Sequence, residues 1–447
     1  MVASVLPPAN SNQGGQTDPV SASFDEDMSA ASPVTFVVNG YQTGRLAGAY
    51  SGGGSTTLQF ASADGFGVGE EVEVSLTGAL TSSAGRGLEP PFVYRFRVET
   101  TDGTGTFDKV QTVPAQFDAM ALAAGDWDRD GHVDLAAANF GSSSVGILMN
   151  DGTGTFSQSG SVAMQIGATA MVAGDWDGDG DLDLAVANFG ANSVALLTND
   201  GSGLFSVAHT VSGQLGAKSL AVGDWDGDGD LDLAVANSGS NSVAILLNNG
   251  AGLFSVARTV SGQQNPAALV SGDWDGDGDL DLAVANFGAN QVAILKNNGA
   301  GVFTVAGTVS GQTGATALVA GDWDGDGDLD LAVANFGADR VAILENNGVG
   351  IFTVAGTVSG QTGATALVAG DWDGDGDLDL AVANFGANQV AILENNGAGI
   401  FTVAGTVSDQ VNVSALAAGD WGGDGALDLA AANKGADSVD VLKNRLP

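Results

Sequence analysis

The sequence contains no cysteine among its 447 residues, and only 13 of them are lysine or arginine. The lack of cysteine excludes disulfides, thiolate metal sites and a cysteine nucleophile. Asp and Glu number 53, so the formal net charge is −40. A chain with this charge repels the phosphates of nucleic acid and of anionic membranes, and no apolar run is long enough to span a bilayer. We therefore expect neither nucleic-acid binding nor membrane insertion.

The acidity does not indicate disorder. Hydrophobic residues make up 44% of the chain, which holds 19 Phe and 7 Trp. Such a composition can bury a core, whereas disordered chains combine high charge with few aromatic residues. Carboxylates in a chain that also builds a core point first to a bound metal.

The chain is dominated by an internal repeat of 49 residues. All seven Trp keep this spacing, and so do a Phe and an Asn in each repeat. Three markers with one period over seven repeats are typical of a β-propeller. The markers are Trp127, Trp176, Trp225, Trp274, Trp323, Trp372 and Trp421; Phe107, Phe156, Phe205, Phe254, Phe303, Phe352 and Phe401; and Asn139, Asn188, Asn237, Asn286, Asn335, Asn384 and Asn433.

One repeat contains four short strand-like runs. In the repeat that starts at 362 they cover residues 366–369, 378–383, 389–393 and 401–407, with a hairpin turn at 395–397. The last repeat stops after its third strand, and the missing fourth strand occurs at 106–113. We predict an all-β protein whose residues 101–447 form a seven-bladed propeller of four-stranded blades, closed by strand 106–113.

Each repeat carries an Asp-rich loop directly after its first strand. Six repeats hold the full pattern D-x-D-x-D-G-x-x-D, as in Asp175, Asp177, Asp179 and Asp183. Carboxylates at positions 1, 3, 5 and 9 of a tight loop can converge on one calcium ion, and Gly at position 6 permits the sharp turn. Without an ion, two carboxylates ~4 Å apart repel by roughly 4 kcal/mol at an effective dielectric constant of about 20. The alternative is a solvated acidic turn.

We therefore predict Ca²⁺ as the cofactor, with six full sites. In the seventh repeat Gly422 replaces the position-3 Asp, so that site should be weak or empty. The predicted carboxylate ligands are Asp126, Asp128, Asp130 and Asp134; Asp175, Asp177, Asp179 and Asp183; Asp224, Asp226, Asp228 and Asp232; Asp273, Asp275, Asp277 and Asp281; Asp322, Asp324, Asp326 and Asp330; Asp371, Asp373, Asp375 and Asp379; and Asp420, Asp424 and Asp428.

The recurring Gly-Asp-Trp-Asp-Gly-Asp-Gly-Asp-Leu-Asp-Leu resembles the FG-GAP/VCBS repeat of integrin α-subunit propellers and many bacterial surface proteins. The resemblance covers about residues 105–447. It implies calcium in the loop between the first two strands of each blade and a partner on the opposite face, made by the 2–3 and 4–1 loops. It also implies a backbone carbonyl ligand at position 7, which is His132, Asp181, Asp230, Asp279, Asp328 and Asp377 in the six full loops.

Residues 1–100 lack the period and the Asp-rich loop. Strand-like runs at 20–24, 35–38, 57–60, 72–76 and 93–98, separated by Gly, Ser and Pro, predict a small β-sandwich. The order of landmarks, such as Ser23-Phe24-Asp25, Leu58-Gln59-Phe60 and Val72-Glu73-Val74, resembles bacterial Ig-like domains of the surface-layer type. No lysine precedes Lys109, which excludes an internal Lys–Asn isopeptide bond in this part.

The sequence offers little for catalysis. Of its two histidines, His132 occupies loop position 7, and His209 falls on an expected outer strand. The paired carboxylates belong to the metal loops, so we predict that the protein is not an enzyme, with a calcium-dependent polysaccharide-active enzyme as an alternative. The strict period of the Trp favours packing between blades over a sugar platform. For the Phe of the Asn-Phe-Gly turns, such as Phe140, core packing is favoured over an exposed aromatic ring.

Two non-enzymatic functions remain open. The first is a calcium-stabilised adhesion or structural protein, extracellular or on a bacterial-type cell surface, that binds a protein or glycan. The second is a subunit of a surface layer or extracellular filament, in which residues 1–20 leave their own domain and complete the sheet of another copy. The repeats that start at 313 and 362 differ at only four of 49 positions, and this uniformity argues against one tailored ligand site.

Overall fold

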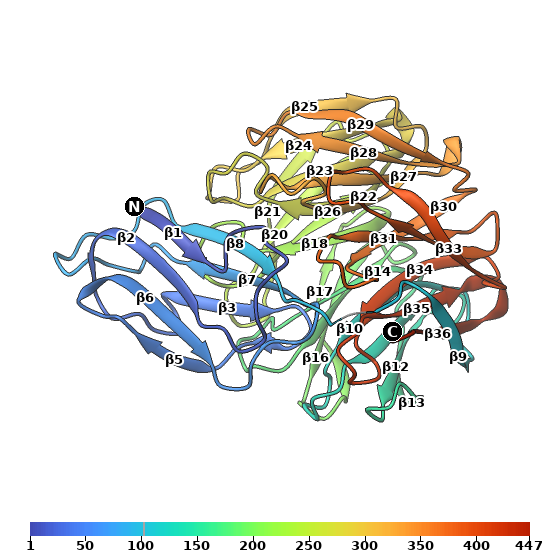
Figure 1. The fold of residues 1–447 in the computed structure, drawn as a ribbon, viewed down its shortest axis with the longest axis horizontal. Coiled ribbons are helices and arrows are strands. Elements are labelled where there is room, and N and C mark those ends of the chain that lie inside the picture. Colours follow the sequence, from blue (N-terminus) through green and yellow to red (C-terminus); the bar gives the residue numbers. More distant parts are fainter. Residues whose placement is uncertain (102) are drawn as a thin grey trace.

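The computed structural model describes residues 1–101 and 103–447. It contains nine four-stranded sheets, two in the N-terminal part and seven in the repeat region. Figure 1 shows the N-terminal sheets beside the ring of repeat sheets. The predicted all-β fold is confirmed. Among the described residues, no helix is long and apolar enough to cross a membrane.

The N-terminal part is a sandwich of two sheets with strand orders β1-β2-β6-β5 and β4-β3-β7-β8. Both sheets contribute to one core, in which Phe60 of the first sheet and Phe36 of the second are buried. The strands are β1 (Val2–Leu6), β2 (Val20–Met28), β3 (Phe36–Gly40), β4 (Gly44–Arg45), β5 (Gly48–Ser51), β6 (Ser55–Ser62), β7 (Glu71–Leu76) and β8 (Phe92–Arg97). All five expected strands are present, and β1, β4 and β5 were not expected.

The second sheet of the sandwich is buried on both faces. In β8, Tyr94 and Phe96 belong to the sandwich core, whereas Val93 and Arg95 on the alternate positions contact the propeller. Because successive side chains of a strand point to opposite faces, a strand covered on both sides buries every residue. This sheet therefore also serves as the contact surface between the two parts of the chain.

Each blade of the propeller is an antiparallel sheet of four strands. In the first six blades the strands follow in chain order. The strands are β10 (Ala119–Gly125), β11 (Asp134–Asn139), β12 (Ser144–Asn150) and β13 (Phe156–Ala163) in blade 1; β14 (Ala168–Gly174), β15 (Asp183–Asn188), β16 (Ser193–Asn199) and β17 (Phe205–Ser212) in blade 2; β18 (Ala217–Gly223), β19 (Asp232–Asn237), β20 (Ser242–Leu247) and β21 (Ser255–Ser261) in blade 3; β22 (Pro266–Gly272), β23 (Asp281–Asn286), β24 (Gln291–Lys296) and β25 (Thr304–Ser310) in blade 4; β26 (Ala315–Gly321), β27 (Asp330–Asn335), β28 (Arg340–Asn346) and β29 (Phe352–Ser359) in blade 5; and β30 (Ala364–Gly370), β31 (Asp379–Asn384), β32 (Gln389–Glu394) and β33 (Thr402–Ser408) in blade 6.

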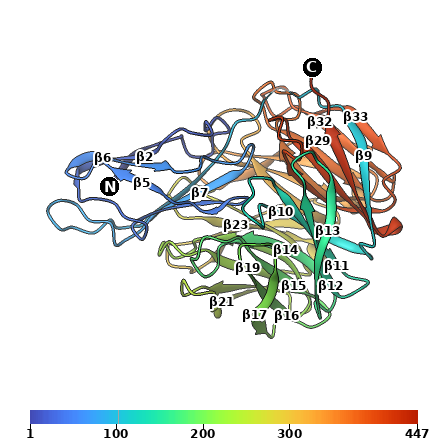
Figure 2. The same cartoon turned by 90° about the horizontal axis from the view of Figure 1, so that it is seen from below.

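The seventh blade joins the two ends of the repeat region. It consists of β34 (Val413–Gly419), β35 (Asp428–Asn433), β36 (Ser438–Asn444) and β9 (Phe107–Pro114). Val113 of β9 is the register partner of Val439 in β36. Figure 2 shows β9 lying among the last strands of the chain. The first strands of blades 1 and 7, β10 and β34, are also in contact, so the ring is closed. Three short 3-10 helices, η1 (Phe287–Ala289), η2 (Phe336–Ala338) and η3 (Lys434–Ala436), form turns between second and third strands.

Tryptophan holds neighbouring blades together. The ring of Trp176 in blade 2 meets Phe254 of blade 3 edge-on, with ring centroids 5.7 Å apart. Asn248 Nδ2 of blade 3 donates to the Trp176 carbonyl at 2.9 Å. All seven Trp are buried, with at most 1% of each residue exposed. They cannot offer a sugar platform, and packing between blades is confirmed.

Candidate metal sites

The Asp-rich loops connect the first and second strands of each blade, and all lie on one face of the ring. Among the described residues, six groups of at least three side chains have ligand atoms within 4.8 Å of one another. Five of these groups hold positions 1, 3 and 9 of loops 1 to 5, namely Asp126, Asp128 and Asp134; Asp175, Asp177 and Asp183; Asp224, Asp226 and Asp232; Asp273, Asp275 and Asp281; and Asp322, Asp324 and Asp330. The fold therefore holds like charges close together, and these charges repel one another unless a cation lies between them.

The position-9 carboxylate is buried at the base of the loop. In blade 2, Asp183 Oδ1 accepts from Asn199 N at 2.8 Å and Oδ2 accepts from Trp176 N at 3.2 Å. It therefore joins the loop to the end of the third strand and to the interblade Trp. Burial raises the pKa of Asp183 to about 8, and the Asp177 charge adds to this rise, against the hydrogen bond from Asn199. A cation at this point would favour the charged form.

The carboxylates at positions 1 and 5 accept hydrogen bonds from backbone N–H groups of their own loop. Asp175 Oδ1 accepts from Gly178 N at 2.8 Å and Oδ2 from Gly180 N at 2.9 Å. Asp179 Oδ1 at position 5 accepts from Asp181 N at 2.8 Å. Gly180 at position 6 has φ +89°, a conformation open mainly to glycine. The position-5 carboxylate lies outside the group formed by positions 1, 3 and 9.

Three of the position-3 carboxylates have unused acceptor capacity. One oxygen each of Asp128, Asp226 and Asp275 is buried and has no hydrogen-bond partner among the described residues. A buried carboxylate oxygen without a donor is costly unless a cation meets it. Clustered hard oxygens are the donors that calcium prefers, so loops 1 to 6 fit this ion.

The position-7 side chains point away from the carboxylate groups. The Asp181 carboxylate lies against Gly201 in the turn between the third and fourth strands, and the His132 imidazole lies against Gly152 in the same way. Arg129 Nε also pairs with Asp181 Oδ1 at 2.6 Å, which links loops 1 and 2. These side chains therefore leave only their backbone for a metal.

The seventh loop has the same framework with a different charge. Asp420 accepts from Asp424 N and Gly425 N, as position 1 does elsewhere. Position 3 is Gly422, and Lys443 Nζ lies 3.1 Å from Asp424 Oδ2. An ammonium group thus lies among the carboxylates of this loop.

The sandwich covers the loop face, which the sequence analysis did not anticipate. The position-6 glycine carbonyls of four loops accept hydrogen bonds from the N-terminal part. The pairs are Val93 N to Gly278 O at 2.8 Å, Asn10 Nδ2 to Gly327 O at 3.2 Å, Asn12 Nδ2 to Gly376 O at 2.5 Å and Thr101 N to Gly425 O at 2.9 Å. The metal loops are therefore also the docking points of the sandwich.

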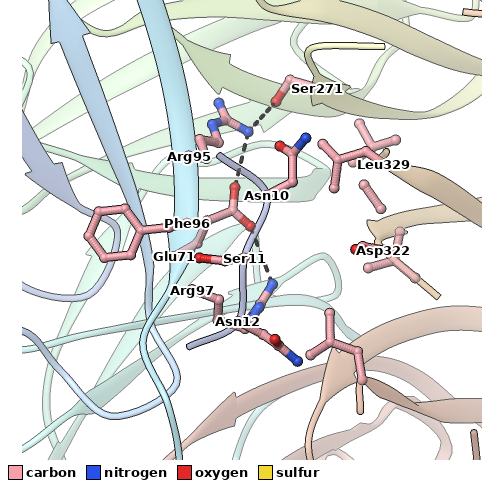
Figure 3. A pocket seen from close by; sticks show the side chains of 15 residues that line it. Asn10, Ser11, Asn12, Glu71, Arg95, Phe96, Arg97, Ser271, Asp322 and Leu329 are labelled. Atoms are coloured by element: carbon pink, nitrogen blue, oxygen red, sulfur yellow. Dashed lines mark hydrogen bonds and ion pairs between the residues drawn. The ribbon is translucent and has the colours of Figure 1, made fainter. Parts of the chain in front are cut away.

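Arg95 is the centre of this contact. It pairs with the buried Glu73 at 2.7 Å and donates to Val222 O and Ser271 Oγ at the ends of two innermost strands. A cavity of about 110 Å³ lies beside it, between the sandwich and blades 4 to 6. Figure 3 shows Ser271, Arg95, Glu71 and Arg97 linked in a row along this cavity. Arg95, which lies between the core residues Tyr94 and Phe96 in β8, is the sequence signal for this contact.

The opposite face carries exposed aromatic side chains. Phe140, Phe189, Phe287 and Phe336 of the turns between second and third strands are 36–41% exposed. The expectation that they pack in the core is wrong for these four, because they lie in turns beyond the strands, where neighbouring blades cover only part of each ring. Near these turns, a cavity of about 390 Å³ is lined by the first strands of all seven blades. Neither histidine lines this cavity or the one at the sandwich contact.

Comparison with known proteins supports the repeat and the fold. Residues 126–186, 175–235, 224–284, 273–333, 322–382 and 371–431 match a family described as the FG-GAP-like repeat. A chain from the crystal structure of BBS1N in complex with ARL6DN is similar with a TM-score of 0.55 and 16% identity, over 77% of this chain and 98% of that one. Streptogramin B lyase matches with a TM-score of 0.51 and 11% identity, over 76% of this chain and 97% of that one. A protein from Lactobacillus plantarum matches with a TM-score of 0.51 and 16% identity, over 84% and 96%. No curated protein sequence matches. These likenesses show the fold alone.

Proposed function

The chain belongs to the FG-GAP-like repeat family, and on this premise we propose that it is a non-enzymatic, calcium-stabilised adhesion or structural protein of the cell surface or extracellular space. One observation carries the proposal: the fold gathers at least three acidic side chains in each of six groups, and in three of these groups a buried position-3 oxygen lacks a partner among the described residues. The sandwich, which we expect to be Ig-like, covers the loop face. A partner protein or glycan then has the opposite face available.

Calcium would be held by the Asp side chains at positions 1, 3 and 9, joined by position 5 and the position-7 carbonyl. It supplies positive charge and no redox chemistry. The carboxylates orient the loop through their backbone hydrogen bonds, so the ion binds the folded chain more tightly than the unfolded chain. Each site occupied at 100 times its Kd adds about 2.7 kcal/mol of stability.

Thermal unfolding and calorimetric calcium titration of the full chain test the metal proposal. We expect about six bound ions and a much lower melting temperature in EDTA. Asp226→Asn should remove one ion, because it neutralises a position-3 ligand. The matched control is Asp200→Asn, which changes an exposed Asp in the turn between the third and fourth strands. Equal melting temperatures in EDTA and in calcium would sink the metal proposal.

The adhesion part depends on the exposed Phe. Binding of the labelled protein to bacterial cells and to a glycan array in calcium should fall for the Phe140→Ser, Phe189→Ser double variant and persist for Asp200→Asn. Equal binding of the double variant and the wild type would contradict a role for this face.

The filament alternative is less well supported. β1 pairs with β2 of its own sheet, with Val5 opposite Ala22, and Asn10 and Asn12 dock on the propeller of the same chain. Strand exchange would have to break these contacts. Electron microscopy in calcium, with and without residues 1–20, distinguishes the two: particles in both samples support adhesion, and polymers only in the longer chain support exchange.

A further inference from the structure

One position beside each metal loop changes its charge from blade to blade. It precedes the Asn that ends the third strand, and that Asn donates its backbone N–H to the position-9 carboxylate, as Asn297 does to Asp281 at 2.7 Å. The residue before it is therefore held next to the loop. In blades 1 to 7 it is Met149, Thr198, Leu247, Lys296, Glu345, Glu394 and Lys443.

In blade 7 this residue is a lysine that lies inside the loop. Lys443 Nζ lies 3.1 Å from Asp424 Oδ2. A Cβ built on Gly422 would collide with Lys443 Nζ, so the ammonium occupies space that a position-3 side chain would need. Asn444 N donates to Asp428 Oδ1 at 2.7 Å and fixes the strand end beside the loop. Lys443 donates a hydrogen bond to the Asp424 carboxylate, and this bond raises the pKa of Lys443. A side chain and its charge have thus replaced both the missing ligand and the ion.

In blade 4 the lysine meets a complete loop. Lys296 Nζ pairs with Asp275 at position 3 and lies 3.1 Å from Asp277 Oδ2 at position 5. The Lys296 side chain is 42% exposed, so it can move into water when another cation arrives. This ammonium and a calcium ion would share the same carboxylates, and they repel each other.

Blades 5 and 6 have the opposite charge at this position. Glu345 and Glu394 add a carboxylate beside loops that already hold four. Glu394 Oε1 and the Asp373 Cβ both lie within 4 Å of the point that a Cβ on Gly105 would occupy, so Glu394 is beside position 3 of loop 6. Extra negative charge next to the site attracts a divalent cation.

We infer that the residue before this Asn sets the cation preference of each loop: Lys443 replaces calcium in blade 7, and Lys296 competes with calcium in blade 4. The inference rests on the proposed calcium function. Calcium sites should be tightest in blades 5 and 6, intermediate in blades 1 to 3, weakest in blade 4 and absent in blade 7. The seven loops, which share one sequence pattern, then differ stepwise in calcium affinity.

Calcium titration calorimetry on the full chain tests the inference. Lys296→Leu, which installs the residue of blade 3, should tighten the weakest class of site by about tenfold or more, because it removes a competing charge. Leu247→Lys should weaken one site by a similar factor. The Gly422→Asp, Lys443→Thr double variant should bind one ion more than the wild type. Lys434→Met, which removes a lysine on the opposite face, is the control and should change nothing.

The outcomes separate the two proposals. A wild type that binds no calcium overturns the calcium function itself. A wild type that binds calcium, with Lys296→Leu and Leu247→Lys giving the same isotherm, overturns only the role of the lysines. If the double variant fails to fold, as shown by circular dichroism, the two single variants still decide.

Discussion

The sandwich and the propeller are both built from four-stranded antiparallel sheets, yet they treat buried charge differently. In the sandwich, the fully buried Glu73 is paired with Arg95. In the propeller, Asp183 is buried beside Asp175 and Asp177, so its neighbours carry the same charge. Glu73 thus has a cationic side chain beside it, whereas the carboxylates around Asp183 add negative charge. On the function proposed above, dependence on metal is confined to the propeller.

The cores differ as well. The sandwich has one cluster that both sheets share, whereas the propeller has a separate cluster between each pair of neighbouring blades. A change in one interblade cluster should therefore lower the stability of the ring and leave the sandwich transition in place.

The largest effect is expected for Trp323→Ala, whose interblade cluster contains no sandwich residue. The side chain is buried and packs on Phe401 with ring centroids 5.6 Å apart. Loss of a buried Trp costs about 3–5 kcal/mol, and full burial places this site near the upper end. Denaturant unfolding, followed by near-UV circular dichroism, measures the change. If the sandwich and propeller transitions lost equal stability, the two parts would unfold as one unit, and their cores would not be independent.

Arg95→Met should cost about 3 kcal/mol, since it leaves Glu73 buried without its partner. The double variant Arg95→Met, Glu73→Leu should recover most of this loss, because no unpaired charge remains. Calorimetric scans should show the sandwich transition separating from that of the propeller in the single variant. A double variant as unstable as the single one would mean that the contact depends on the arginine's shape and not on charge.

The pH dependence should distinguish the two parts. Burial raises the pKa of Glu70 in the sandwich to about 7 and that of Asp183 to about 8. A carboxyl with a raised folded pKa stabilises fully below its unfolded pKa near 4, and this stability is lost as pH rises through the folded value. In EDTA, both melting temperatures should fall by several degrees from pH 5 to pH 8. With calcium, only the propeller should reverse this trend, because binding requires the ionised form. If the melting temperature of the propeller fell with pH in calcium as it does in EDTA, the metal sites would be contradicted.

The smallest effect is expected for Arg45→Met. Arg45 Nη1 lies 3.6 Å from Asp230 Oδ1, and both side chains are partly exposed. Ion pairs in such settings contribute about 0–1 kcal/mol, so the melting temperature should change by no more than a few degrees. A loss as large as that of Arg95→Met would show that the rim of the contact matters as much as its centre.

The repeat made the propeller predictable. Residues 49 apart occupy equal places in successive blades, so the period predicted the strands; the run expected at 389–393 is found as β32, Gln389–Glu394. Trp was assigned to the blade contacts for the same reason. In the loops, alternate Asp at fixed spacing predicted that positions 1, 3, 5 and 9 converge; positions 1, 3 and 9 do so, whereas position 5 lies outside the group.

What the sequence did not indicate depends on contacts between non-repeated parts. Nothing in Asn10 or Asn12 shows that they meet loops more than 300 residues away, because no period relates the sandwich to the ring. The exposure of Phe140 was missed because an aromatic residue in a regular pattern resembles a core residue. Lys296 and Lys443 occupy equal places in two repeats, but only the position of the third-strand end beside the loop brings them to the carboxylates.

The pairing of β9 with β36 also sets an order in time. β9 leaves the ribosome before any blade is complete, yet its partner is the last strand of the ring. Until β36 is made, β9 follows the sandwich without a strand to pair with. The growing row of blades then has an uncovered blade at each end. The sandwich can fold early, but the circle is finished only when residues 438–444 have been synthesised. Late truncations should therefore leave open, aggregation-prone edges even though nearly every blade is present.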